Sequence, residues 1–409
     1  MHTPDFTRRC ALGKAGDAGV GRNRLAVKHP PSVIIYFIYM PELADIVKLH
    51  KAEYLTKYGA QVPENHRKAL WQIENCRTET LGGHIERCSN SCGYERYRYN
   101  SCQSRSCPKC NGIHTARWVK KKQDSLLPVQ YFHLVFTLPS CLRDIVRAHQ
   151  KIAYSILLRS AAEAVIILAK DPKYVGGLIG VIAILHTWSR TMFFHPHAHL
   201  LIPGGGINTE GGWNQSHKKY LIPYQPAATI FRALFIKRLK KALPEVTIPD
   251  AVWNKEWVVD VRATAPNPMI AVKYLSNYIN RIAITNRRIL ACNDDVVKIS
   301  YKRNKDIQWC TMKLKPEEFL RRYLEHVLPK GFVRIRYYGI FTSANKKLFR
   351  QVRSDLLTIF EKSDNVSKPD IIDITHLFHE IHTCPQCLTG YLVIVAEVPK
   401  RRQTVYEPP

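Results

Sequence analysis

The sequence has 409 residues, enough for two or three domains with hydrophobic cores of their own. Its net charge is +28, while 45% of the residues are hydrophobic and 10% are aromatic. This composition excludes a disordered basic tail and indicates a folded protein with a polyanionic partner, for which nucleic acid is favoured over a membrane surface. Neither a secretory signal nor an apolar run of the roughly 18 residues in a membrane span is recognisable, so we expect reduced cysteines and a cytoplasmic protein.

The N-terminal residues 1–40 mix arginine, glycine and proline without the period of a helix or a strand. An amphipathic segment follows Met40, so we interpret Met40 as the natural start and residues 1–40 as a disordered or spurious extension. The alternative is a flexible basic arm that contacts DNA phosphates.

Residues 41–125 are predicted to form a zinc-binding, DNA-recognition domain. Two close cysteine pairs lie about 15 residues apart, which is the spacing of a tetrahedral structural zinc site. The alternative is a small core of free cysteines. The predicted Zn²⁺ ligands are Cys88, Cys92, Cys107 and Cys110, with Cys102, Cys76 and His84 as substitutes.

Residues 126–345 are predicted to form an α+β domain. Strand-like apolar runs begin at Tyr131, Leu178 and His199. Because strands and helices do not alternate strictly, an α+β fold is favoured over a doubly wound parallel sheet. Helical patterns cover residues 142–170, 227–243 and 269–282.

Three histidines, His195, His197 and His199, occupy every second position of one segment. On a strand they project from one face, so His197 and His199 can chelate a single cation. A lone histidine is more often a satisfied core residue, but a row of them followed by a proline and three glycines is hard to explain by packing. The third ligand is open among His195, His186 and His133.

Two tyrosines, Tyr274 and Tyr278, lie one turn apart in the predicted helix 269–282, so both hydroxyls share a face. Alone, such a pair more often belongs to a core or to surface stacking. Nearby arginines favour a functional interpretation, because guanidinium groups bind phosphate in a bidentate manner. The predicted DNA-phosphate ligands are Arg281, Arg287 and Arg288.

The histidines and tyrosines fit one reaction. A cation held by histidines polarises a scissile phosphate, and a tyrosine hydroxyl attacks it to give a phosphotyrosine. The ester conserves the energy of the broken bond, so a second strand can be joined without ATP. Two tyrosines on one helix allow two successive transfers.

The sequence resembles the rolling-circle insertion-sequence transposases, which carry a His-hydrophobe-His metal motif and a Tyr-x-x-x-Tyr nucleophile helix. The resemblance covers about residues 42–345, with the motifs in the family's order. It rests mainly on Cys107-Pro-Lys-Cys110, Tyr131-Phe-His-Leu-Val-Phe-Thr-Leu-Pro, His195-Pro-His-Ala-His199, Tyr274 to Ile289 and His326 to Gly339.

This resemblance implies that His197 and His199 bind a catalytic Mg²⁺ or Mn²⁺ and that Tyr274 and Tyr278 are the nucleophiles. It also implies an antiparallel sheet with packed helices, preceded by a zinc-binding domain. Such a protein cuts and joins single-stranded DNA at element ends, in the bacterial cytoplasm and on the nucleoid when active. We expect no membrane partner and no small-molecule substrate, and the oligomeric state is open.

Residues 346–409 are predicted to be a basic C-terminal tail with one Cys-x-x-Cys, Cys384 to Cys387, which His379 and His382 could complete as a second zinc site. Two other functions stay open. A plasmid rolling-circle replication initiator or relaxase would share the same chemistry, and a non-catalytic DNA-binding remnant would keep only the zinc. A carboxylate nuclease is disfavoured because no acidic trio with suitable spacing is evident.

Overall fold

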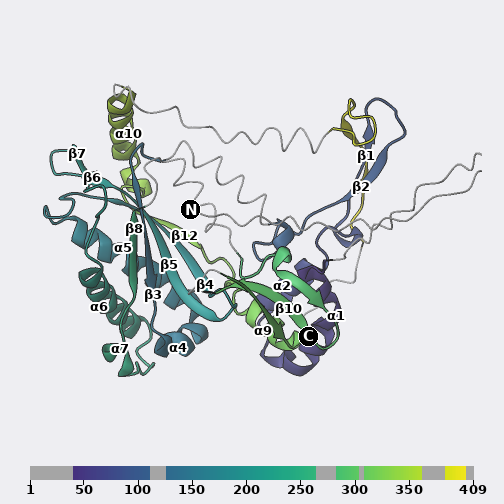
Figure 1. Ribbon diagram of the computed structural model, residues 1–409, viewed down its shortest axis with the longest axis horizontal. Helices are drawn as coiled ribbons and strands as arrows, with labels where there is room; N and C mark the ends of the chain where they lie inside the picture. Colours follow the sequence, from purple (N-terminus) through teal and green to yellow (C-terminus); the bar gives the residue numbers. More distant parts are fainter. Residues whose placement is uncertain (1–39, 111–125, 264–281, 304–307, 362–382, 402–409) are drawn as a thin grey trace, which may run out of the picture. The chain divides into compact units, whose positions relative to one another are not determined.

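The structure, a computed structural model (Figure 1), combines helices with antiparallel sheets and so confirms the predicted α+β class. Residues 1–39 of the predicted extension lie outside the described residues, as do Tyr274, Tyr278 and Arg281. The described residues are 40–110, 126–263, 282–303, 308–361 and 383–401.

A five-stranded sheet, which we call the central sheet, has the strand order β12-β4-β5-β3-β8 with every neighbouring pair antiparallel (Figure 1). β5 is the middle strand, so its backbone is hydrogen-bonded on both sides. The segments predicted as strands at Tyr131, Leu178 and His199 lie in β3, β4 and β5. The strands are β3 (Tyr131–Thr137), β4 (Gly180–Trp188), β5 (Phe194–Pro203), β8 (Val259–Ala263) and β12 (Ile335–Gly339).

Helices α5 and α6 cover one face of the central sheet (Figure 1). Side chains alternate along a strand, and the apolar set of β5, which includes Phe194, Ala198 and Leu200, is buried in one core with both helices. The histidines of β5 therefore point to the opposite face. The helices around this core are α4 (Arg143–Ala148), α5 (Gln150–Ala169), α6 (Tyr224–Ala242) and α7 (Ala251–Asn254).

The helix α5 is long and apolar enough to cross a membrane by length and composition alone. In the protein, 61% of the apolar stretch of this helix is buried, and Tyr154, Leu157 and Ala161 pack into the core under the sheet. Arg159 and Glu163 interrupt the run, which is why the sequence shows no continuous apolar span. α5 is the core helix of the central sheet.

The opposite face of the central sheet is covered only in part. Near one end, Leu201 packs with Tyr131 and Ile182 against Val352 of helix α10 (Lys346–Glu361). α10 lies in the segment predicted as a tail, so the amphipathic helix at residue 346 belongs to the folded protein. The short hairpin that also contributes to this core consists of β6 (Gly205–Ile207) and β7 (Trp213–Gln215).

A third core joins parts of the chain that precede and follow the central sheet. Leu43 and Ile46 from the N-terminal helix pack with Phe319 and Leu320 from a helix far along the sequence. A three-stranded sheet of order β11-β10-β9 adds Ile299 to this core. These elements are α1 (Leu43–Tyr58), α2 (Glu64–Glu74), β9 (Ile289–Cys292), β10 (Val297–Lys302), β11 (Trp309–Leu314) and α9 (Pro316–Leu324).

A second three-stranded sheet, which we call the cysteine-rich sheet, has the order β13-β1-β2. Its strands are β1 (Gly83–Cys88), β2 (Glu95–Tyr99) and β13 (Leu392–Val398), and both pairings are antiparallel. β13 also comes from the segment predicted as a tail. Its partner β1 lies about 300 residues earlier in the chain.

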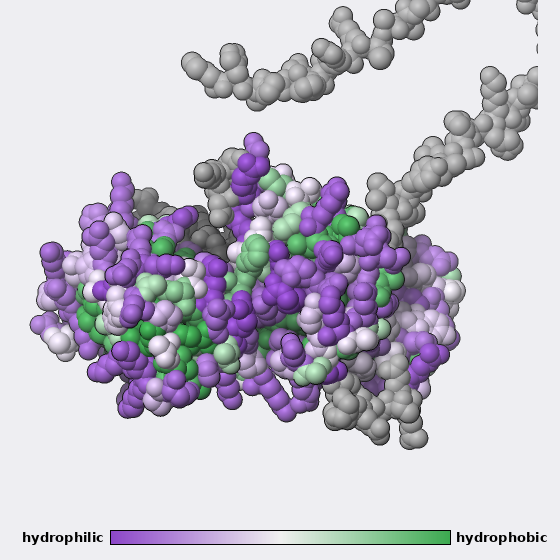
Figure 2. All heavy atoms as spheres, turned by 90° about the horizontal axis from the view of Figure 1, so that it is seen from below, coloured by the Kyte–Doolittle hydropathy of each residue, from purple (hydrophilic) through white to green (hydrophobic). Residues whose placement is uncertain are grey.

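The surface of the described residues is mainly polar. Hydrophilic side chains cover most of the face seen from below, and apolar side chains show as separate patches between them (Figure 2). Exposed large apolar side chains such as Trp253, Trp309 and Ile359 come from different elements.

Candidate active site

Three histidines meet on the face of the central sheet that is opposite α5. His197 and His199 are two positions apart on β5, and the neighbouring strand β4 places His186 directly across from His197. One nitrogen from each ring lies within 4.8 Å of the other two. Alternation along β5 explains two members of the group, and the register of β4 against β5 supplies the third.

The other two candidates for the third ligand lie beside this group. His195 is on the same face of β5, with its ring centroid 5.1 Å from that of His197, and burial lowers its pKa. His133 is on β3, the strand on the other side of β5, and its Nε2 lies 2.8 Å from Nδ1 of His199. Of the three residues left open by the sequence, His186 joins His197 and His199.

Hydrogen bonds at Nδ1 orient the two histidines of β5. Nδ1 of His197 lies 2.6 Å from the carbonyl oxygen of His195. A carbonyl can only accept, so this Nδ1 carries the proton and the lone pair of the ring is on Nε2. Burial lowers the pKa of His133 to about 4, so at neutral pH His133 is uncharged and can accept from Nδ1–H of His199. Metal-binding imidazoles are typically oriented by such hydrogen bonds.

The histidines line a cavity of about 540 Å³ with basic and aromatic walls. Arg190, Lys302 and Trp309 line it too, and its lining within the described chain contains no aspartate or glutamate. Trp309 is 63% exposed, and the Nζ of Lys302 lies 5.1 Å from its ring centroid. An exposed indole beside an ammonium group suits a nucleotide, whose base stacks while its phosphate is neutralised.

The structure separates the four cysteines that the sequence analysis assigned to one zinc site. Cys107 and Cys110 group with the predicted substitutes Cys76 and Cys102, whereas the other pair groups with the C-terminal Cys-x-x-Cys. The reason is the β1–β2 hairpin. Cys88 and Cys92 lie at the tip of this hairpin, whereas the group that contains Cys107 and Cys110 lies at its base. The six residues of β1, which separate the tip from the base, span roughly 20 Å. The single-site assignment is therefore corrected to two groups. The second one consists of Cys88, Cys92, Cys384 and Cys387.

The group at the base of the hairpin has the geometry of a closed thiolate site. Sγ of Cys110 lies 3.5 Å from Sγ of Cys76 and 3.6 Å from Sγ of Cys102. Four sulfurs held about 2.3 Å from a tetrahedral zinc are about 3.8 Å apart, whereas a disulfide bond measures about 2.05 Å. The third substitute, His84, is hydrogen-bonded to Glu86 instead.

Comparison with known proteins identifies the family. Residues 46–138 match the family described as "Transposase zinc-binding domain", and residues 180–348 match the family described as "Putative transposase". Over 380 residues the chain is 32% identical to the protein named "Putative transposase y4qJ" of Sinorhizobium fredii, a match that covers 87% of this chain and 95% of the relative. The chain belongs to this transposase family.

A second relative is the transposase for insertion sequence element IS801 of Pseudomonas savastanoi pv. phaseolicola. This chain is 26% identical to the IS801 transposase over 289 residues, which cover 66% of this chain and 68% of the relative. No solved structure matches the chain. The two family matches include the histidines of β4 and β5 and the cysteines at the base of the hairpin, but they end before Cys384.

The two described arginines that were predicted to bind phosphate differ in their surroundings in the transposase. Arg288 lines the histidine cavity, where its guanidinium group donates hydrogen bonds to three backbone carbonyls. Arg288 thus braces the cavity wall. Arg287 is exposed, and its contact with DNA phosphate stays a prediction. Arg281 lies outside the described residues together with Tyr274 and Tyr278, so their roles stay predictions.

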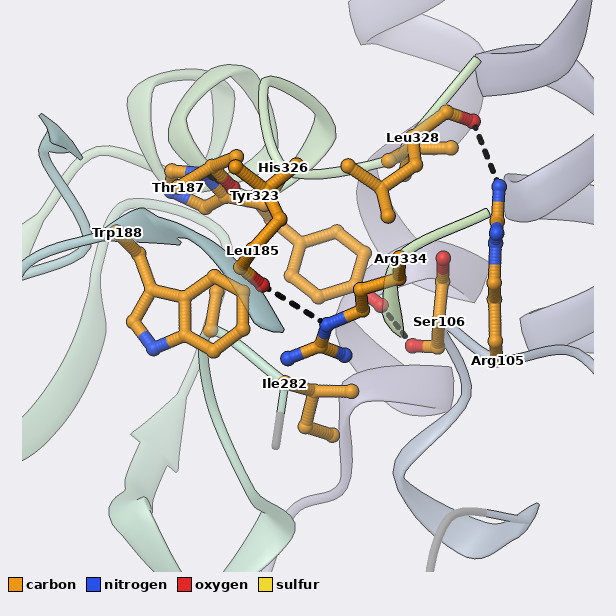
Figure 3. Close-up of a pocket in the computed structure, with 12 residues that line it drawn as sticks. Arg105, Ser106, Leu185, Thr187, Trp188, Ile282, Tyr323, His326, Leu328 and Arg334 are labelled. Atoms are coloured by element: carbon orange, nitrogen blue, oxygen red, sulfur yellow. Dashed lines mark hydrogen bonds between the residues drawn. The ribbon is translucent and has the colours of Figure 1, made fainter. Parts of the chain in front are cut away.

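The transposase also connects its zinc-binding segment to the histidines through the pocket in Figure 3. The hydroxyl of Tyr323 on α9 donates to the carbonyl of Ser106, which lies in the loop of the first cysteine group. Arg334 donates to a β4 carbonyl at 3.0 Å and lies over the ring of Trp188. Trp188 in turn stacks on His186, with ring centroids 4.8 Å apart. The sequence analysis assigned no function to Trp188 or Trp309.

Proposed function

We propose that this transposase nicks and rejoins single-stranded DNA at insertion-sequence ends through a 5′-phosphotyrosine intermediate, in rolling-circle-like transposition. The observation that carries the proposal is the group of three histidines in a basic, aromatic cavity on an antiparallel sheet. The family's Tyr-x-x-x-Tyr motif assigns the nucleophilic role to Tyr274 and Tyr278.

The donor chemistry of the histidine group fits a divalent cation. His186, His197 and His199 would bind it through imidazole nitrogens and leave positions for a phosphate oxygen and water. Nitrogen donors suit Mn²⁺ better than Mg²⁺, which prefers oxygen, so we expect Mn²⁺ to support the higher activity. When bound, the cation draws charge from the scissile phosphate.

The chain's own groups carry the transfer. A tyrosine oxygen bonds to phosphorus as the bond between phosphorus and the 3′ oxygen breaks; the phenol proton leaves to water, and the departing oxygen takes up a proton. In rejoining, a 3′-hydroxyl attacks the phosphotyrosine and restores the phenol. Trp309 and Lys302 hold the strand at the cavity by stacking and charge.

The test uses single-stranded DNA from the element ends, labelled at its 3′ end so that the fragment joined to tyrosine carries the label. In Mn²⁺ or Mg²⁺ the wild type should shift the label to the protein on a denaturing gel. We expect Tyr274→Phe/Tyr278→Phe and His197→Ala to lower this product by roughly 1000-fold or more. DNA affinity should stay within about twofold, since the phosphate and base contacts remain.

Tyr220→Phe is the matched control, because Tyr220 is an exposed tyrosine outside the cavity. Covalent product from the double tyrosine variant would remove the mechanism. Binding without covalent product in both metals would favour the non-catalytic DNA-binding remnant. A wild type that nicks but never joins two ends would favour the replication initiator or relaxase.

A further inference from the structure

Four cysteines join two parts of the chain that lie far apart in sequence. Sγ of Cys88 lies 3.6 Å from Sγ of Cys387, which is 299 residues away, and Sγ of Cys92 lies 3.6 Å from Sγ of Cys384. All four sulfurs lie within 4.8 Å of one another. These separations are too long for disulfide bonds and close to the roughly 3.8 Å between thiolates on a tetrahedral zinc.

Both turns that carry these cysteines direct backbone N–H groups at sulfur. The N–H of Asn90 donates to Sγ of Cys88 at 3.4 Å, and the N–H of Gly390 donates to Sγ of Cys387 at 3.3 Å. Hydrogen bonds to sulfur stabilise the thiolate form, which is the form that binds metal. The two turns are thus built alike around a common centre.

Gly390 shows how closely the backbone approaches the sulfurs. A Cβ added at this position would lie 2.5 Å from Sγ of Cys88 and 3.2 Å from Sγ of Cys387. A side chain there would push the two cysteines apart. Glycine is therefore required by the sulfur group itself and not by a left-handed backbone.

The cysteine-rich sheet has almost no apolar core to hold β13 in place. Its buried cluster consists of Cys88, Cys384 and Leu392 alone among the described residues. Val393 and Ile394 of β13 are 45% and 64% exposed. Small folds that bury so little apolar surface generally need a metal or a covalent link, and closing so long a loop adds an entropic penalty.

We propose that the transposase binds a second structural Zn²⁺ through Cys88, Cys92, Cys384 and Cys387, and that this zinc fastens β13 to β1. The match to the transposase zinc-binding domain ends at residue 138. The proposed site adds two zinc ligands from the C-terminal part of the chain, beyond that match. His379 and His382, offered by the sequence as partners of the C-terminal pair, are not needed, because the hairpin tip supplies both remaining thiolates.

The experiment counts zinc in the purified full-length protein by mass spectrometry, without using DNA cleavage as a readout. Apart from any Zn²⁺ on the histidine group, which all these proteins share, we expect about two zinc ions per chain in the wild type and one in either Cys384→Ser/Cys387→Ser or Cys107→Ser/Cys110→Ser. Cys141→Ser should keep both, because Cys141 lies outside the two groups. One zinc in the wild type that survives the first double substitution would overturn the proposal.

A second measurement holds even if a variant fails to fold. Apo-protein should take up two equivalents of Co²⁺ that give the charge-transfer absorption of tetrahedral thiolate ligation; Co²⁺ on the histidine group gives no such absorption. Gly390→Ala should weaken Co²⁺ binding at the site that contains Cys88 and Cys387, and leave Co²⁺ binding at the other cysteine site unchanged. Uptake of one equivalent, or titration showing that the four thiols are oxidised to two disulfides, would overturn the proposal.

Amide exchange in β13 should speed up at least about tenfold in the metal-free site, while β5 stays protected.

Discussion

His133 shows how a residue that does not belong to the cation group can control it. It lies on the neighbouring strand β3, and its Nε2 faces Nδ1 of His199 at 2.8 Å. Its lowered pKa keeps it uncharged, so its Nε2 can accept a hydrogen bond from Nδ1–H of His199 and thereby fix the tautomer of His199. His133 is thus a positioning residue for the proposed metal site.

Replacing His133 should weaken the metal site without removing any ligand. We expect His133→Phe to lower Mn²⁺ affinity about 10- to 100-fold, the usual effect of losing the hydrogen-bond partner of a ligand. Isothermal titration with Mn²⁺ measures this directly, and the metal dependence of cleavage measures it independently.

His133→Asn keeps an acceptor and should recover part of the affinity. His217→Ala, at an exposed histidine that does not line the cavity, is the control. Equal Mn²⁺ affinity in the phenylalanine variant and the wild type would show that His133 has only a packing role.

At the scale of elements, the strand β1 contains a buried carboxylate that organises its neighbour β2. The side chain of Glu86 is 3% exposed and lies 2.7 Å from Nε of Arg96 and 3.0 Å from Nη1 of Arg98. Burial alone would raise the pKa of Glu86, but hydrogen bonds from Arg96, Arg98 and His84 lower it to about 2. Both guanidinium groups are held in place on a half-exposed face of the cysteine-rich sheet.

Neutralising this carboxylate should loosen both arginines. We expect Glu86→Gln to reduce the free energy of unfolding by about 1–3 kcal/mol, the typical effect of leaving buried polar groups unsatisfied. Affinity for single-stranded element ends should fall as well, measured by fluorescence anisotropy.

Glu95→Gln is the matched control for Glu86→Gln, because Glu95 pairs with Arg87 on the exposed side of the same hairpin. The zinc content should remain that of the wild type in both variants. If the two substitutions had equal effects on stability and on DNA affinity, Glu86 would not organise the sheet.

The sequence predicts features that depend on neighbouring residues in the chain. Prediction from the sequence fails for features that depend on how two distant strands pair. Alternation alone placed His197 and His199 on one strand face. The choice of His186 over His195 and His133 depends on the register of β4 against β5, which no local pattern encodes. The cysteine pairing failed for the same reason, since the length of a hairpin and a C-terminal strand decide it.

At the scale of the whole molecule, buried neutral histidines make stability depend on pH. His326 donates from Nε2 to the carbonyl of Met192 at 3.0 Å and accepts from the hydroxyl of Thr187 at 3.1 Å. Burial lowers its pKa from 6.5 to about 4, and burial lowers that of His66 similarly. The folded protein therefore keeps these rings neutral at a pH where the unfolded chain protonates them.

The sign of the pH dependence follows from these shifts. The contribution is fully present above about pH 6.5 and is lost as the pH falls from 6.5 towards 4. For His326 alone we expect a loss of about 2 kcal/mol in the free energy of unfolding between about pH 7 and pH 5, measured by urea denaturation.

His326→Gln preserves a donor and an acceptor but cannot be protonated, so its acid-induced loss should be smaller by that amount. Because both proteins keep the same metal-binding residues, release of zinc at low pH affects them equally. The same acid-induced loss in the variant and the wild type would contradict the assignment.

The pairing of β13 with β1 has a consequence for protein synthesis. Cys88 precedes Cys387 by 299 residues, so at roughly 5–20 residues per second the ribosome needs roughly 15–60 s to make the second after the first. During that interval the hairpin of β1 and β2 has neither its third strand nor the thiolates that complete its tip. The cysteine-rich sheet is therefore completed only late in translation, after the sheet with the histidines has been made.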